Sequence, residues 1–147
     1  MKKETTDTIK VIIDNREIET EIHIKRKETK HDHTVTAALS LDGVDYVGIG
    51  KNCDVDEPLA DLQKKLPDGA IIKCCVTCQY GHFCPYGSDG DTMLCIFPET
   101  ISDKLDLVDL MAKNKYAIKK NADCCENFAL AKDEFYSYNS FLHYLKG

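Results

Sequence analysis

The most informative stretch of this chain runs from Lys73 to Pro98 and reads KCCVTCQYGHFCPYGSDGDTMLCIFP. It holds five of the eight cysteines, between an apolar run that ends at Val76 and another that begins at Met93. The loop between these runs is rich in Gly, Pro, Ser and Asp, which favours tight turns. Four thiolates at such spacing can hold a tetrahedral metal ion, most simply Zn²⁺. The stretch therefore predicts a domain fastened by a structural zinc ion.

Cys75 and Cys78 are the expected first two ligands. The two residues between them let backbone N–H groups turn toward the sulfur atoms, and Gly81 permits the sharp reversal that such a knuckle needs. Because successive side chains of an extended backbone point to opposite sides, Cys74 is not expected to reach the same metal as Cys75. We expect Cys74 to pack in the core as a small apolar residue.

The other two ligands come from later in the chain. Cys95 lies where the second apolar run leaves the loop, opposite the knuckle in a hairpin. Cys125, Cys84, Cys124 and His82 compete for the fourth position. Spacing favours Cys125 over Cys84, because a site closed within the loop would leave the two thiols at 124–125 without a role. The expected four-cysteine zinc site is therefore Cys75, Cys78, Cys95 and Cys125.

Several residues of this region also resemble a group of small uncharacterised bacterial cysteine-rich proteins. The resemblance rests on the knuckle, the Pro85-Tyr86-Gly87 turn, Cys95, and a final Cys125-Glu126-Asn127-Phe128 run, and it covers residues 75–128. It implies that Cys125 is the fourth ligand of a zinc site and that Cys84 is an extra cysteine. The doubled cysteines at both ends depart from the pattern and leave the ligand register open. The resemblance carries no activity, because that group has no established function.

The first fifty residues alternate between apolar and polar side chains, as half-buried strands do. The Asp42-Gly43 pair between two such runs is a strong hairpin signal. We expect an antiparallel β-meander over residues 1–50, with strands at 9–13, 18–25, 35–41 and 44–49.

Helices are expected mainly after this meander. Leu59, Leu62 and Leu66 recur at helical spacing before a Pro67-Asp68-Gly69 stop, with Asp54 or Asp56 as the cap. Further helices are expected over residues 102–113 and, from aromatic spacing, over 133–146. Strands followed by helices indicate an α+β fold with helices packed on the sheet and a cysteine-rich zinc-knuckle hairpin. The chain is then one domain over residues 1–147, with its cysteine-rich metal-binding part at 70–128.

Charge and cysteine usage bear on compartment and partners. The formal net charge is −6, whereas a nucleic-acid partner calls for a basic face, so we expect no nucleic acid and a protein partner of basic character. The polar N-terminus predicts no secretory signal, and no apolar run has the length of a membrane span. Thiols in the reducing cytoplasm bind metal or stay free, whereas disulfides would be the alternative in a secreted chain. We therefore expect a cytoplasmic protein.

These observations favour a non-enzymatic protein-binding module. A closed all-thiolate site leaves no position for a substrate, so its zinc is structural. The stiffened loop over residues 80–91, with aromatic side chains at Tyr80, Phe83 and Tyr86, is the expected contact surface. An immunity-type protein that masks a basic toxin is one specific form. The alternative is a metal- or thiol-dependent enzyme or redox protein that uses the Cys75–Cys78 or His82 region.

Overall fold

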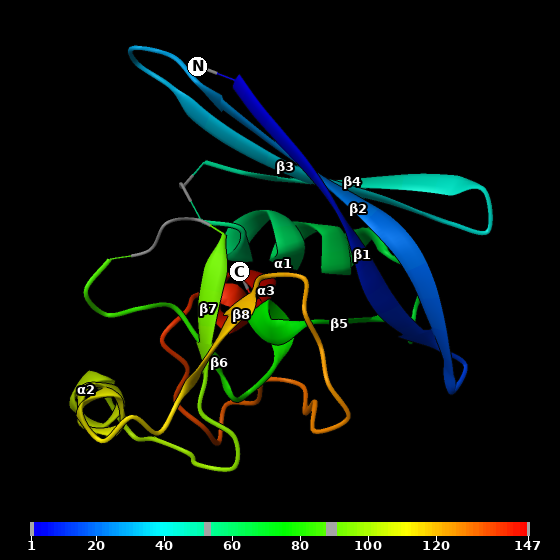
Figure 1. Cartoon of the computed structure of the whole chain (residues 1–147). Helices are drawn as coiled ribbons and strands as arrows, with labels where there is room; N and C mark the ends of the chain where they lie inside the picture. Colours follow the sequence, from blue (N-terminus) through cyan, green and yellow to red (C-terminus); the bar gives the residue numbers. More distant parts are fainter. Residues whose placement is uncertain (1, 52–53, 88–90, 147) are drawn as a thin grey trace.

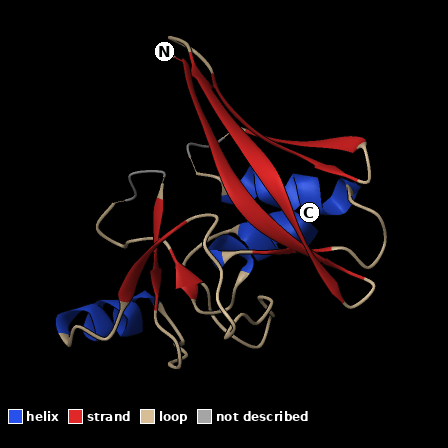
Figure 2. Ribbon diagram, turned by 45° about the vertical axis from the view of Figure 1, so that its right-hand side comes forward, coloured by secondary structure: helices blue, strands red, loops and turns tan. Residues whose placement is uncertain are grey.

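Two antiparallel sheets and a few helices make up the fold of the computed structural model, which describes residues 2–51, 54–87 and 91–146 (Figure 1). The larger sheet has the strand order β4-β3-β2-β1-β5, and the smaller one has the order β6-β7-β8. Figures 1 and 2 show α1 and α3 between the sheets and α2 on the outer side of the smaller sheet. The predicted α+β class with an N-terminal antiparallel meander is therefore confirmed.

The meander is built from long paired strands. Its strands are β1 (Lys2–Ile13), β2 (Arg16–Glu28), β3 (His33–Leu41) and β4 (Val44–Gly50). Each of its two tight turns has a positive φ at two successive residues, Asp14 and Asn15 in the first turn and Asp42 and Gly43 in the second. The first strand begins well before its expected start at Ile9, because pairing with β2 extends the ladder beyond the apolar alternation.

Helix α1 (Asp56–Lys65) closes the open side of the curled sheet between β4 and β5 (Ile71–Lys73). It packs so tightly on β4 that a Cβ atom at Gly48 would lie 2.0 Å from the carbonyl oxygen of Pro58. The helix begins as expected near Pro58, but its N-cap is Val55, without a side-chain cap hydrogen bond.

Side chains of α1 also form hydrogen bonds with backbone groups at both edges of this sheet. At the β5 edge, the Gln63 amide accepts from Ile72 N–H at 2.8 Å and donates to the Ala70 carbonyl at 2.6 Å. At the β4 edge, the bonds are Ile49 N–H to Asp61 at 2.9 Å, Lys51 N–H to Glu57 at 2.6 Å, and Lys65 Nζ to the Val47 carbonyl at 2.9 Å. Helix α1 therefore covers the apolar face of the sheet and also forms hydrogen bonds with the backbone of both edge strands.

The main core fills the concave face of the larger sheet beneath α1 and α3 (Phe141–Lys146). Its fully buried members include Val11, Ile22, Val35, Leu39, Leu62, Ile72 and Phe141. The helix expected over 133–146 begins only at Phe141, so its first half was predicted wrongly. Backbone N–H groups there bond to distant side chains, since Tyr138 N–H donates to His82 Nδ1 at 2.9 Å and Ser140 N–H to Asp56 at 2.7 Å.

The smaller sheet carries the second half of the chain. It consists of β6 (Gly81–His82), β7 (Thr92–Cys95) and β8 (Ala117–Lys120) and packs with α2 (Lys104–Ala112). The helix expected over 102–113 is thus confirmed, and Asp103 caps it by accepting from Asp106 N–H at 3.0 Å. No helix among residues 2–51, 54–87 and 91–146 is long and apolar enough to cross a membrane.

Candidate metal centre

Where the knuckle was predicted, the chain forms a single turn of 3₁₀ helix, η1 (Cys75–Thr77), that follows β5. Thr77 is fully buried, and its hydroxyl donates to the Ile72 carbonyl at 2.7 Å and accepts from Cys74 N–H at 3.2 Å. Cys78 N–H closes the turn on the Cys75 carbonyl at 3.3 Å. Thr77 therefore holds the knuckle in shape, a role that the cysteine spacing gave no reason to assign.

Backbone hydrogen bonds attach this knuckle to a segment about fifty residues further along the chain. Cys75 N–H donates to the Asp123 carbonyl at 2.7 Å, Gln79 N–H to the Ala129 carbonyl at 2.7 Å, and Ala131 N–H to the Thr77 carbonyl at 2.9 Å. Cys124 and Cys125 lie at the start of the attached segment, so it carries both of them to the knuckle.

Strand register explains how Cys95, the third predicted ligand, comes close to the other cysteines. Gly81 on β6 is paired with Cys95 on β7. A Cβ atom at Gly81 would lie 1.9 Å from the Cys75 carbonyl oxygen, so this glycine is needed for the close approach of two backbones. The expected sharp reversal is not its role, since its φ is not among the positive ones. Because side chains alternate along a strand, His82 points to the opposite side from Cys95.

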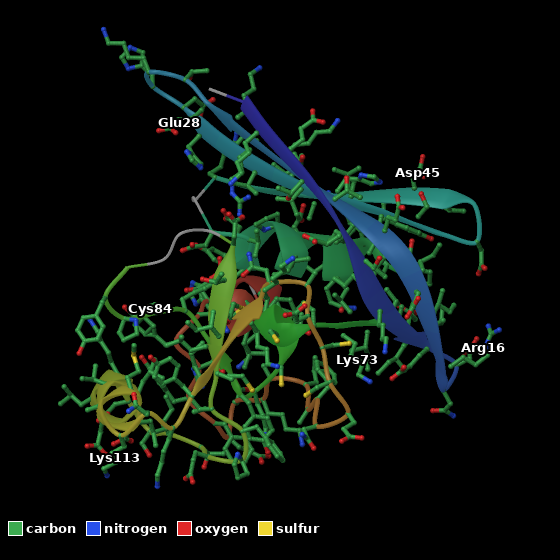
Figure 3. The ribbon with its side chains drawn as sticks, in the orientation of Figure 1. Arg16, Glu28, Asp45, Lys73, Cys84 and Lys113 are labelled. Carbon is green, nitrogen blue, oxygen red and sulfur yellow. The ribbon has the colours of Figure 1, made fainter. Side chains whose placement is uncertain are left out.

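One small cavity of about 30 Å³ collects the cysteines. The aromatic residues Tyr80, Phe97 and Phe128 also line it. Figure 3 shows sulfur atoms beside Lys73, whereas Cys84 lies on the other side of the smaller sheet. The six cysteines that line the cavity are Cys74, Cys75, Cys78, Cys95, Cys124 and Cys125.

Both members of each doubled cysteine pair therefore lie at the same cavity. Cys74 and Cys75 line it together because the chain leaves the extended conformation at Cys75 and enters the 3₁₀ turn. Cys74 is fully buried and belongs to the main core, as expected.

Burial is the main influence on the pKa of three of these thiols, Cys74, Cys75 and Cys78. It raises the pKa of Cys74 to about 11. Burial, followed by the charges of Cys74, Cys95 and Cys78, raises the pKa of Cys75. Burial likewise raises the pKa of Cys78, although N–H groups of Ala129 and Tyr80 act in the other direction. Thiols of raised pKa are poor nucleophiles at neutral pH, which argues against the reactive-thiol alternative.

The other candidates for the fourth position lie elsewhere. Cys84 packs beside the cluster of Leu94 and Ile96 and lines a different cleft. His82 is fully buried away from the cavity, and burial lowers its pKa to about 4. Of the four competing residues, only Cys125 and Cys124 line the cavity.

The gathered thiols are neither paired with one another nor drawn to a common centre. All seven cysteines of the described residues are free, and Cys53 lies outside those residues. Within residues 2–51, 54–87 and 91–146, no group of three His, Cys, Asp or Glu side chains has the geometry to hold a metal ion. The cavity therefore brings candidate ligands into one place, and metal binding would require their sulfur atoms to move to a common centre.

The expected contact loop is only partly exposed. Tyr86 is 73% exposed, but Phe83 is buried in the main core at 6% exposure. Tyr80 packs edge-on against Phe97, with ring centroids 5.0 Å apart. Residues 88–90 of the expected surface lie outside the described residues. Of the three loop aromatics, Tyr86 is thus the one available to a partner.

Comparison with known proteins gives a family and no function. No curated protein and no solved structure matches the chain. One family, described as "Family of unknown function (DUF6304)", matches residues 5–81, just over half of the 147 residues. The match runs from β1 through the knuckle, so it includes Cys75 and Cys78 but neither Cys95 nor Cys125. The expectation of an uncharacterised family is confirmed, and the chain belongs to the family of unknown function DUF6304.

Proposed function

We propose that this protein is a non-enzymatic protein-binding module whose second half is fastened by a structural Zn²⁺ ion on Cys75, Cys78, Cys95 and Cys125. The observation that carries the zinc proposal is the single small cavity that these four residues line together. Zinc prefers four thiolates in a closed tetrahedral site, and such a site has no open position for a substrate. The ion would join the knuckle, β7 and the 123–131 segment.

Cys124 and Cys125 both line the cavity. We assign Cys125 to the metal, as the cysteine spacing and the resemblance to the cysteine-rich group favour, and Cys124 to the wall beside it.

Metal analysis tests the zinc site directly. Protein purified without chelator should carry one zinc ion per chain, and Ser substitution at any of the four ligands should remove it. Cys84→Ser is the matched control, because Cys84 lies at another cleft and should leave the zinc content unchanged. Metal-free wild-type protein, or equal loss in Cys84→Ser, would refute the site.

Chelation separates a structural ion from an incidental one. Removal of a structural zinc ion should lower the melting temperature and expose the four ligands to a thiol reagent, since metal binding and folding are coupled. An unchanged melting temperature after zinc has been removed would contradict the structural role.

We further propose a cytoplasmic protein that binds a basic partner, of which an immunity-type protein is one form. A net charge of −6 supports a basic partner, and free thiols support a reducing compartment. Immobilised protein should retain a basic protein from the source cells in a salt-dependent way. Recovery should fall with Tyr86→Ala and persist with Val44→Ala, which changes an exposed residue on β4. Equal recovery with both variants would count against the 80–91 contact surface.

A further inference from the structure

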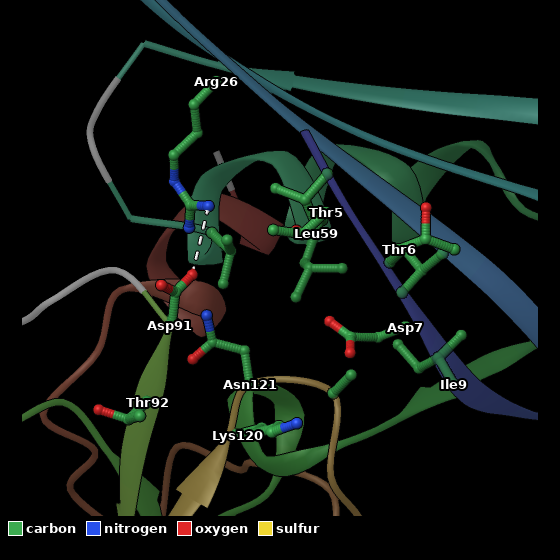
Figure 4. Close-up of a pocket in the computed structure, with 14 residues that line it drawn as sticks. Thr5, Thr6, Asp7, Ile9, Arg26, Leu59, Asp91, Thr92, Lys120 and Asn121 are labelled. Carbon is green, nitrogen blue, oxygen red and sulfur yellow. Dashed lines mark ion pairs between the residues drawn. The ribbon is translucent and has the colours of Figure 1, made fainter. Parts of the chain in front are cut away.

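A second cavity lies between the two sheets, away from the cysteines. Its volume is about 460 Å³, within the usual range for small-molecule sites. Strands β1 and β2 and helix α1 form one wall, while Asp91 and residues 120–122 form the other (Figure 4). The aliphatic part of the lining consists of Ile9, Ile22, Ile24, Val55, Leu59 and Ala122.

The inward face of the larger sheet becomes polar at this cavity. Along β1, Asp7 occupies the same side as the buried Ile9 and Val11, because residues two apart share a face. Asp7 pairs with Ile22 on β2, and Arg26 follows on the inward side of that strand. Charged side chains at inward positions do not help to bury a core, so this part of the sheet face needs another explanation.

Arg26 is accounted for by a link between the sheets. One carboxylate oxygen of Asp91 forms an ion pair with the Arg26 guanidinium at 3.6 Å, and the other forms one with Lys3 Nζ at 3.1 Å. The dashed ion pair in Figure 4 marks the first of these contacts. One carboxylate, directly before β7, thus contacts two cations of the larger sheet, so both of these cations already have a partner.

Two opposite charges line the rest of the cavity, one on the half-buried Asp7 and one on the exposed Lys120. Neither the Asp7 carboxylate nor the Lys120 ammonium has a hydrogen-bond or ion-pair partner among the described residues. Asp7 comes from the larger sheet and Lys120 from the smaller one. Figure 4 shows the Asp7 carboxylate pointing into the space that Asn121 and Lys120 face from the other wall. The aliphatic side chains of Ile9, Ile22 and Leu59 lie beside them.

We propose that this cavity binds a small zwitterion with an aliphatic group, as in a free aliphatic amino acid. Its ammonium group would pair with Asp7 and its carboxylate with Lys120, while its aliphatic group contacts the Ile9 and Ile22 side chains. Such a ligand satisfies both unpaired charges at once and covers apolar surface, which neither a simple anion nor a simple cation does. The site is independent of the zinc proposal, because it shares no lining residue with the cysteine cavity.

Three matched probes test the proposal by isothermal titration calorimetry on the full chain. L-Leucine carries both charges, 4-methylpentanoate lacks the ammonium group, and isoamylamine lacks the carboxylate. We expect saturable binding of L-leucine and at least tenfold weaker binding of the other two. Equal or tighter binding of either single-charge analogue, or no saturable binding of L-leucine, overturns the proposal.

Variants then assign the two charges. Asp7→Asn should weaken L-leucine binding at least tenfold and bring it close to that of 4-methylpentanoate, while Lys120→Gln should bring it close to that of isoamylamine. The controls are Glu4→Gln, exposed on β1, and Lys27→Gln, exposed on β2, which should bind L-leucine as the wild type does. Melting temperatures verify that each variant is folded. Folded Asp7 and Lys120 variants with wild-type affinity would refute the assignment.

Discussion

His82 offers a quantitative test of how the smaller sheet is packed. Its ring is fully buried, and Tyr138 N–H donates to Nδ1 at 2.9 Å. The neutral ring therefore carries its hydrogen on Nε2, for which the described residues provide no hydrogen-bond partner. Burial alone lowers the pKa of His82 from 6.5 to about 4. The protein should thus resist protonation of this ring while it remains folded.

The sign and size of the effect on stability follow from this pKa. Because the folded-state pKa lies below the unfolded one, the unfolded chain binds the proton first, and stability is lost as pH falls from about 6.5 toward 4. A difference of one pKa unit corresponds to about 1.4 kcal/mol, so the shift from 6.5 to about 4 predicts a loss of about 3 kcal/mol by pH 4.

Urea unfolding at pH 7, 6, 5 and 4 measures this loss. His82→Asn keeps an acceptor near the position of Nδ1 and removes the titration, so its free energy of unfolding should fall less steeply than that of the wild type. His31→Asn is the control, because it changes an exposed turn residue and should follow the wild-type curve. Any acid-induced loss at the cysteines is common to all three proteins. Parallel curves for wild type and His82→Asn would refute the argument.

Three further predictions concern close contacts and a buried carboxylate. Gly81→Ala should lower the free energy of unfolding by about 3 kcal/mol, since its Cβ would meet the Cys75 carbonyl, and denaturant titration measures this. Gly48→Ala should lower the free energy of unfolding by a similar amount, because its Cβ would force α1 away from β4 at Pro58, and thermal unfolding measures this. Burial raises the pKa of Asp56, so the folded protein favours its protonated form. The free energy of unfolding of the wild type, relative to Asp56→Asn, should therefore fall as pH rises from 3 to 6. Urea titrations measure this difference, and an increase with pH would contradict the prediction.

Local sequence signals predicted those parts of the fold whose contacts are local. Apolar alternation and the Asp42-Gly43 turn predicted the meander, because side-chain period and turn chemistry fix the register of a hairpin. The leucine spacing from Leu59 to Leu66 likewise predicted α1. Each of these elements is determined by residues a few positions apart.

The failures occurred where the backbone bonds to distant partners. Aromatic spacing suggested a helix from residue 133, but Tyr138 and Ser140 donate their N–H groups to His82 and Asp56 instead. Side-chain alternation gave no sign that the 3₁₀ turn at Cys75 places both Cys74 and Cys75 at the wall of one cavity. Cysteine spacing grouped Cys75, Cys78, Cys95 and Cys125, which line one cavity, but it gave no sign of the polar cavity between the sheets.

The hydrogen bonds from α1 to both edge strands of the larger sheet limit how this protein can associate with other chains. Unsatisfied N–H and C=O groups on an edge strand recruit further strands, which leads to fibrils or to peptide capture by strand addition. Here Gln63 on one edge, and Glu57, Asp61 and Lys65 on the other, already engage those groups. Association through this sheet must then proceed by side-chain complementarity, and loss of these helix side chains should turn a protected edge into a template for aggregation.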